Sequence, residues 1–199
     1  MGMYMVSLGR REWFEAGEEP EDGWGRVASA LNDELRRRGL PAFESMPEET
    51  GFVRGSGLAF EEKLVPPMDG FLRLAEAHLS RDETESLCGW TVLVPLSLEE
   101  DIRLDGVETS YTDETTVAGA PQVLALAERL AAVVQLPPET PQMCDNLDLT
   151  TWFLDGSAAE LTARRPGPWA DDLDTAFYVA LYLRAAQHAL RRGCPIVFS

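Results

Sequence analysis

The sequence predicts an α+β fold: about four helices packed on a mixed or largely antiparallel sheet, in a single compact domain spanning residues 1–199. Three observations predict this class. The composition, 45% hydrophobic and 26% charged over 199 residues, is that of a globular protein whose length favours one domain. Helix-like and strand-like patterns are interleaved, with no linker or internal repeat between them. A hairpin-like middle argues against a purely parallel sheet.

The first predicted element is a short strand at residues 4–8, followed by an acidic loop. A helix is predicted over residues 23–38, because apolar residues recur there at helical spacing. Asp22 is placed to cap its first turn, and the three arginines at 36–38 complement its negative end. The glycine-rich stretch 41–67 is predicted to be irregular, with a loop or hairpin around residues 55–57.

A second helix is predicted over residues 69–79, and a buried strand over residues 88–98, where both faces are apolar. Pro95 removes one hydrogen-bond donor, so the pairing of this strand should weaken there. Residues 102–117 alternate loosely around an Asp-Gly pair, which predicts a hairpin or a pair of short antiparallel strands.

A third helix is predicted over residues 121–136, with prolines at its beginning and after its end. Residues 147–154 alternate between apolar and polar side chains, which predicts a strand. The longest helix is predicted over residues 171–192, with acidic residues in its first turn and arginines in its last. A terminal strand is predicted over residues 196–198.

The charge is the most unusual property of the chain. It has 34 acidic and 17 basic residues, a formal net charge of −17. Long-range repulsion disfavours binding to nucleic acid or to an anionic membrane. All the basic residues except Lys63 are arginines, which indicates a GC-rich bacterial genome. Adaptation of a whole proteome to salt is a rival explanation of the acidity.

The cysteines and the N-terminal segment predict a cytoplasmic protein. Cys88, Cys144 and Cys194 are odd in number and widely spaced, which favours reduced thiols over disulfides. No signal-peptide pattern or membrane-spanning apolar run is present in the sequence.

No metal-binding motif, nucleophile motif or cofactor motif is present, so we expect no cofactor and no metal. His78 and His188 each lie on a predicted helix with no other histidine nearby in the sequence. Both are interpreted as ordinary hydrogen-bonding side chains.

Two polar segments hold the candidate binding residues. One precedes the strand predicted at 88–98, and the other surrounds the strand predicted at 147–154. The candidates are Asp82, Glu83, Glu85, Asp145, Asp148 and Trp152. Solvated surface charges, and a tryptophan that fills the core, are the simpler interpretation of the same residues.

The leading hypothesis is a non-enzymatic, acidic protein-binding module, of the immunity or inhibitor type, that neutralises a basic protein partner. The alternative is an enzyme in which these carboxylates hold Mg²⁺ or Ca²⁺, or form an acid–base pair. A structural subunit of a homo-oligomer is the third hypothesis. The first requires a localised acidic site, and the second requires carboxylates that converge.

Overall fold

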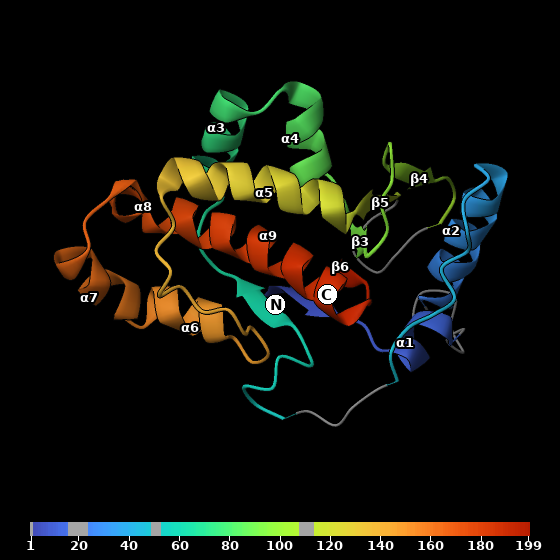
Figure 1. Ribbon diagram of the computed structural model, residues 1–199, viewed down its shortest axis with the longest axis horizontal. Helices are drawn as coiled ribbons and strands as arrows, with labels where there is room; N and C mark the ends of the chain where they lie inside the picture. The colour runs from blue at the N-terminus through green and yellow to red at the C-terminus, as the bar shows by residue number, and fades with distance from the viewer. Residues whose placement is uncertain (1, 16–23, 49–52, 108–113) are drawn as a thin grey trace.

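A computed structural model describes residues 2–15, 24–48, 53–107 and 114–199. Six strands form one sheet in the order β2-β1-β6-β3-β5-β4 (Figure 1). Their bounds are β1 Met3–Ser7, β2 Glu61–Leu64, β3 Val92–Val94, β4 Ile102–Leu104, β5 Thr115–Gly119 and β6 Ile196–Phe198. Only β3 and β5 pair in parallel; every other neighbouring pair in the described sheet is antiparallel. The predicted α+β class, with a mixed and largely antiparallel sheet, is therefore confirmed.

The prediction of about four helices is wrong, because the described residues form nine. They are α1 Arg10–Phe14, α2 Gly25–Arg37, α3 Asp69–His78, α4 Arg81–Cys88, α5 Ala120–Val134, α6 Asp148–Leu154, α7 Ser157–Arg164, α8 Pro168–Asp171 and α9 Leu173–Arg192. The four predicted helices correspond to α2, α3, α5 and α9, with ends that differ by a few residues. Asp22, the predicted cap of α2, lies outside the described residues.

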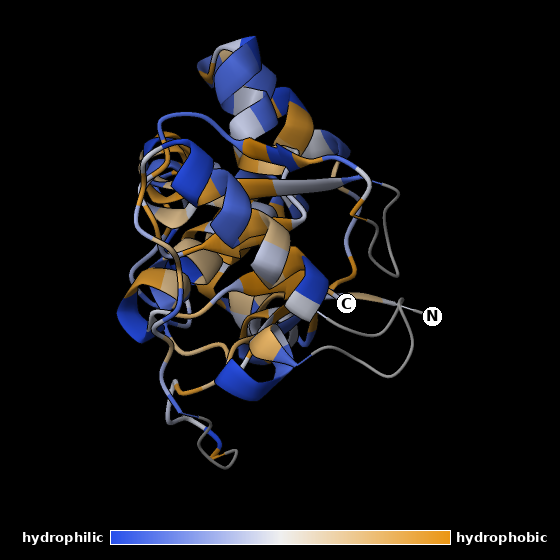
Figure 2. Ribbon diagram, turned by 90° about the vertical axis from the view of Figure 1, so that its right-hand side faces the viewer, coloured by the Kyte–Doolittle hydropathy of each residue, from blue (hydrophilic) through white to orange (hydrophobic). Residues whose placement is uncertain are grey.

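Helices cover both faces of the sheet, because side chains alternate between two hydrophobic clusters along the central strands. Leu93 and Ile196 belong to the cluster beneath α3, α5, α6 and α9, whereas Val92 and Val197 belong to the cluster beneath α1 and α2. Successive residues of a strand point to opposite faces, so a strand buried on both faces is apolar throughout. Figure 2 shows hydrophobic residues concentrated on the strands and inner helices, with hydrophilic residues on the outer surfaces.

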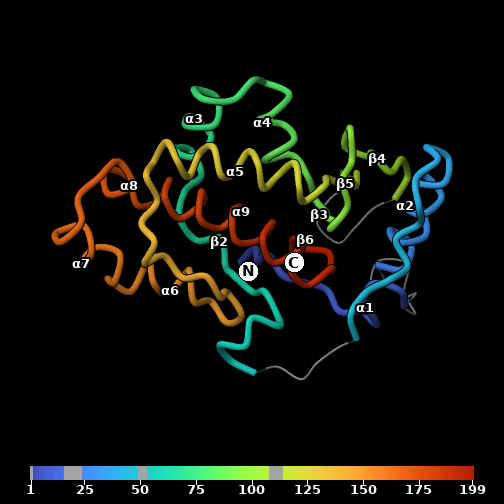
Figure 3. Tube along the Cα trace, in the orientation of Figure 1, coloured from blue at the N-terminus to red at the C-terminus, as the bar shows by residue number. Residues whose placement is uncertain are grey.

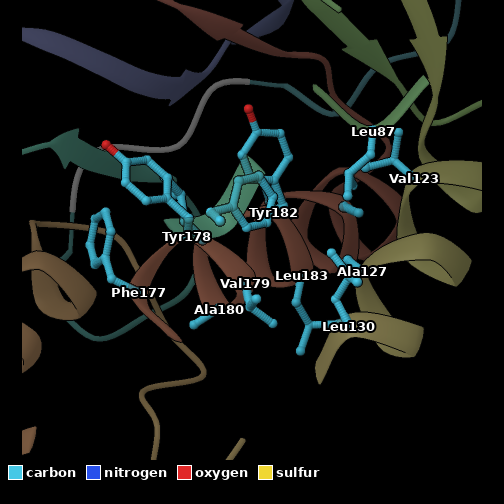
Figure 4. Close-up of a cluster of buried hydrophobic side chains, with 14 of the residues drawn as sticks. Leu87, Val123, Ala127, Leu130, Phe177, Tyr178, Val179, Ala180, Tyr182 and Leu183 are labelled. Carbon is cyan, nitrogen blue, oxygen red and sulfur yellow. The ribbon is translucent and has the colours of Figure 1, made fainter. Parts of the chain in front are cut away.

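The larger layer is organised around α9, which is buried along most of its length. It packs closely along α5 and also contacts α3, α6 and α8. Figure 4 shows side chains of α9 meeting Val123, Ala127 and Leu130 of α5. This helix is therefore packed on more than one side.

The segment predicted as a strand at 147–154 is the helix α6, so that prediction is wrong. Leu147 adopts a left-handed backbone conformation, with φ of 58°, and the helix begins at the next residue. Leu149 and Phe153, four positions apart, face the core together. Their alternation with polar residues is typical of a strand, but the segment folds as a helix, in which residues four positions apart share one face.

The strand predicted at 88–98 is much shorter than expected. It consists of β3 alone, because the residues before it continue α4 as far as Cys88. A capping box begins α4: the Ser80 side chain accepts a hydrogen bond from the Glu83 backbone N–H, and the Glu83 carboxylate accepts one from the Ser80 backbone N–H. The strand ends immediately before Pro95, where weakened pairing was predicted.

The stretch predicted as irregular contains β2, an edge strand whose first three residues are charged. Charged residues are common on edge strands because they oppose pairing with other chains. They also leave the segment without the apolar pattern by which a strand is predicted. The predicted hairpin at 102–117 is confirmed by the antiparallel pairing of β4 with β5. The predicted terminal strand is β6, which lies between β1 and β3.

Candidate functional site

A hollow of about 230 Å³ lies between α4, the segment leading into β4, and β5. Three carboxylates line it, from Asp82, Glu85 and Asp101, together with one guanidinium, from Arg103. Ser86, Gly89 and Thr116 complete its lining. We call this site the acidic hollow. Figure 1 shows α4 above the sheet, on the side that carries β3, β4 and β5.

Asp101 is the most enclosed carboxylate of the acidic hollow. It is half-buried, and its Oδ2 accepts a hydrogen bond of 2.9 Å from the Ser86 hydroxyl. Burial raises the pKa of Asp101, and the neighbouring charge of Glu85 raises it further, against the opposing effects of Ser86 and Arg103. A bound cation would favour the ionised form of Asp101 and so would oppose both the burial and the repulsion from Glu85. Asp101 was not among the candidate residues, because only the folded chain brings it beside α4.

Glu85 and Arg103 form an ion pair of 2.8 Å at the rim of the acidic hollow, with both side chains more than half exposed. An exposed pair of this kind contributes little to stability and exchanges readily. Asp82 lines the same hollow from the first turn of α4. The structure therefore brings two of the six candidate residues, Asp82 and Glu85, together at one site.

Glu83 has a structural role instead. Its carboxylate takes part in the capping box of α4, and it also forms an ion pair with Arg129 of α5. The Arg129 hydrogen bond is the largest cause of the lowered pKa of Glu83. Glu83 thus joins α4 to α5 and does not line the acidic hollow.

Asp145 holds a loop by accepting hydrogen bonds. It is 1% exposed, and its two oxygens accept from the backbone N–H groups of Gly55 at 3.0 Å and Gly57 at 3.1 Å. Burial alone would raise its pKa, but these backbone donors outweigh it and the pKa is lowered. Asp148 in turn accepts from the backbone N–H groups of Asp145 and Asn146, both at 3.2 Å. These carboxylates stabilise the turn before α6.

Trp152 lies on α6, half-buried, with its ring against the rings of Phe153 and Trp169. With Asp148 it lines a second, more open hollow of about 440 Å³. Figure 1 shows α4 and α6 on opposite sides of the pair formed by α5 and α9. The six candidates therefore divide into two groups, one on each side of that pair.

The side chains that could bind a metal ion are dispersed in the same way among the described residues. In residues 2–15, 24–48, 53–107 and 114–199, no group of three or more His, Cys, Asp and Glu side chains gathers closely enough to hold a metal ion. His78 is exposed in the last turn of α3, whereas His188 is 2% exposed and its ring lies against that of Phe60. Burial, Arg191 and Arg192 lower the pKa of His188 to about 3.

Exposed carboxylates also occur well away from the acidic hollow. They are found on α1, α2, α5, α7 and the first turn of α9. Several are neutralised locally, as where Asp33 pairs with Arg36 on α2. What distinguishes the acidic hollow is a concave lining with a carboxylate that is half-buried.

Comparisons with protein-family models, with curated proteins and with solved structures find no match for this chain. Among the described residues, no helix is both long and apolar enough to cross a membrane.

Proposed function

We propose that the protein is a non-enzymatic binding module, of the immunity or inhibitor type, that receives a basic side chain of a partner protein in the acidic hollow. The observation that carries the proposal is the lining of that hollow, in which three carboxylates face one guanidinium. A guanidinium or ammonium group from a partner would balance this excess. Complementary charges of this kind give an interface its specificity and its rapid association.

The size of the acidic hollow also favours a side chain over a small-molecule ligand. Its volume of about 230 Å³ is below the roughly 300 to 1,000 Å³ of typical ligand pockets. It is suited to the end of an arginine or lysine side chain, whose remaining contacts would lie on the surrounding surface. The net charge of −17 would attract a basic partner before contact is made.

Binding of a tetra-arginine peptide, followed by NMR, tests the proposal. We expect the largest shifts in the amide signals of Ser86, Gly89 and Thr116. Asp101→Asn should weaken binding about tenfold, which is about 1.4 kcal/mol, because it removes the most enclosed carboxylate. Glu160→Gln, an exposed carboxylate on α7, is the matched control and should change the affinity less than twofold.

Equal losses in Asp101→Asn and Glu160→Gln would show that the peptide responds to overall charge, and the proposed site would be wrong. The enzyme hypothesis is tested in the same experiment by titrating MgCl₂ and CaCl₂. Saturable shifts at Asp82 and Glu85, with none caused by the peptide, would favour a carboxylate-held cation. The raised pKa of Asp101 beside Glu85 is the one observation that favours an acid–base pair.

A further inference from the structure

A third hollow, of about 520 Å³, opens where β1 ends and α9 turns into β6. The two segments meet through a hydrogen bond of 3.0 Å from the Leu8 backbone N–H to the Pro195 carbonyl. Figure 3 traces β1 into α1 beside the end of α9. We call this site the β1 hollow. Its volume is within the range of small-molecule pockets.

Arg192 lines the β1 hollow and is unusual among the arginines. Four arginines have neither a hydrogen bond nor an ion pair among the described residues, at positions 73, 81, 164 and 192. The other three are exposed, whereas Arg192 is partly buried. In a chain with twice as many acidic as basic residues, a partly buried arginine without a carboxylate partner is an open position for an anion.

The surroundings of Arg192 suit an anionic group. Cys194 and Leu8 are buried and line the hollow beside it. Burial raises the pKa of the Cys194 thiol to about 11, so it is neutral at pH 7 and does not repel an anion. Ser7 also lines the hollow; its oxygen accepts a hydrogen bond of 2.9 Å from the Phe60 backbone N–H, which leaves the hydroxyl proton available to a ligand.

The lining of the β1 hollow also contains acidic residues. Glu15 and Glu48 line it, and they also line an adjoining hollow of about 420 Å³ that Arg192 does not reach. Glu15 and Glu48 are therefore shared with the adjoining hollow, whereas Arg192 lines the β1 hollow and not the adjoining one. Glu15 is paired with Arg11 at 2.9 Å, whereas Glu48 is exposed and has no ion pair among the described residues.

The balance of charges in the lining disfavours a simple anion. Glu12, Glu15 and Glu48 outnumber the guanidiniums of Arg11 and Arg192 in the lining, so a ligand with negative charge alone would be repelled. A ligand that carries both a negative and a positive charge can pair with an arginine and with a glutamate of the lining. Leu8, Pro47, Leu58 and Ala59 also line the hollow and supply an apolar surface.

We propose that the β1 hollow binds a free α-amino acid with an apolar side chain. The carboxylate pairs with Arg192 and the Ser7 hydroxyl, the ammonium pairs with Glu48, and the side chain lies on the apolar surface. This site is separate from the acidic hollow, so its existence does not depend on the binding of a basic partner.

Calorimetry and NMR with L-leucine test this proposal. We expect saturable binding that shifts the backbone amide signals of Ser7 and Cys194. Two analogues, 4-methylpentanoate without the ammonium and 3-methylbutylamine without the carboxylate, should each bind at least about tenfold more weakly, since each leaves one charged group of the site unpaired. Absence of saturable binding up to about 10 mM leucine, or equal binding of an analogue, would overturn the proposal.

Arg192→Gln should raise the Kd for leucine at least about tenfold, whereas its effect on 3-methylbutylamine should be small. Arg164→Gln, which changes an exposed arginine that also lacks an ion pair, is the control and should leave the Kd unchanged. If Arg192→Gln does not fold, Arg192→Lys retains the charge and should weaken binding less than the loss of the carboxylate does. Equal effects of the substitutions at 192 and 164 would contradict the assignment.

Discussion

Glu62 on β2 holds Thr150 in the first turn of α6. Its Oε2 accepts hydrogen bonds from the Thr150 backbone N–H at 2.8 Å and from the Thr150 hydroxyl at 2.7 Å, while Oε1 accepts from the Leu149 backbone N–H at 2.8 Å. The first N–H groups of a helix have no hydrogen-bond partner within the helix. A carboxylate accepts hydrogen bonds from them, and its negative charge interacts favourably with the positive end of the helix dipole. An edge strand thus fixes where α6 begins.

Replacing this carboxylate should destabilise the fold. We expect Glu62→Gln to lower the free energy of unfolding by about 1–3 kcal/mol, because the amide directs donors towards N–H groups in a site that is 0% exposed. Urea denaturation measures the difference. Glu61→Gln, on the exposed face of the same strand, should change the value by less than about 0.5 kcal/mol. Similar effects of the two substitutions would refute the capping role.

His188 should make stability depend on pH. Its pKa falls from an ordinary 6.5 to about 3 in the folded protein, mainly through burial and then through Arg191 and Arg192. Between these values the unfolded chain binds a proton that the folded protein does not, so the free energy of unfolding should decrease as the pH falls below 6.5. The slope is at most about 1.4 kcal/mol per pH unit.

The pKa of Glu62 is raised, mainly by burial, and its contribution therefore has the opposite sign. Comparing wild type with His188→Gln separates the two, since Glu62 is present in both. The stability advantage of wild type over the variant should shrink between pH 7 and pH 5. A difference that is constant over this interval would show that His188 titrates alike in both states.

Asp145 should act as a structural residue. We expect Asp145→Asn to accelerate amide hydrogen exchange at Gly55 and Gly57 and to lower the free energy of unfolding by about 1–3 kcal/mol, because one acceptor oxygen and its charge are lost. Asp155→Asn, which alters an exposed residue at the end of α6, is the control. Unchanged exchange at both glycines would argue against the loop-holding role.

The three thiols should be unreactive in the folded protein. Burial raises the pKa of Cys88 to about 12 and of Cys194 to about 11, and the pKa of Cys144 is also raised by burial. Because only the thiolate reacts, iodoacetamide at pH 8 should modify all three slowly and Cys88, the least buried, first. Mass spectrometry should show three rapid modifications in urea. Rapid labelling of one thiol in buffer alone would contradict these pKa directions.

The elements predicted correctly are those whose signals are local. The spacing of apolar residues and the charges at the ends identify α2, α3, α5 and α9. For α6 the deciding interaction is not local: Glu62, 87 residues before Leu149, supplies the cap. The alternation in its sequence then favours the wrong structure. Alternation is a dependable sign of a strand only where no distant residue stabilises a helix.

The candidate site was predicted only in part, because some of its residues are close in the sequence and others are distant. The acidic residues of α4 are adjacent in sequence, so Asp82 and Glu85 could be selected together. Asp101 joins them only because α4 and the approach to β4 lie side by side in the fold. Arg192 was interpreted as a charge that complements the end of a helix, and only the structure shows that it lines the β1 hollow with no carboxylate partner among the described residues.

The position of β6 governs how the sheet is completed during synthesis. β6 follows the other five described strands in the sequence, yet it pairs with both β1 and β3 and, in the described part of the sheet, is the only link between its two halves. While the ribosome still holds residues 196–198, the pair β1–β2 and the trio β3–β5–β4 each expose an unpaired edge. Such edges recruit other chains. A nascent chain of this protein therefore exposes two unpaired strand edges until residues 196–198 emerge and join them.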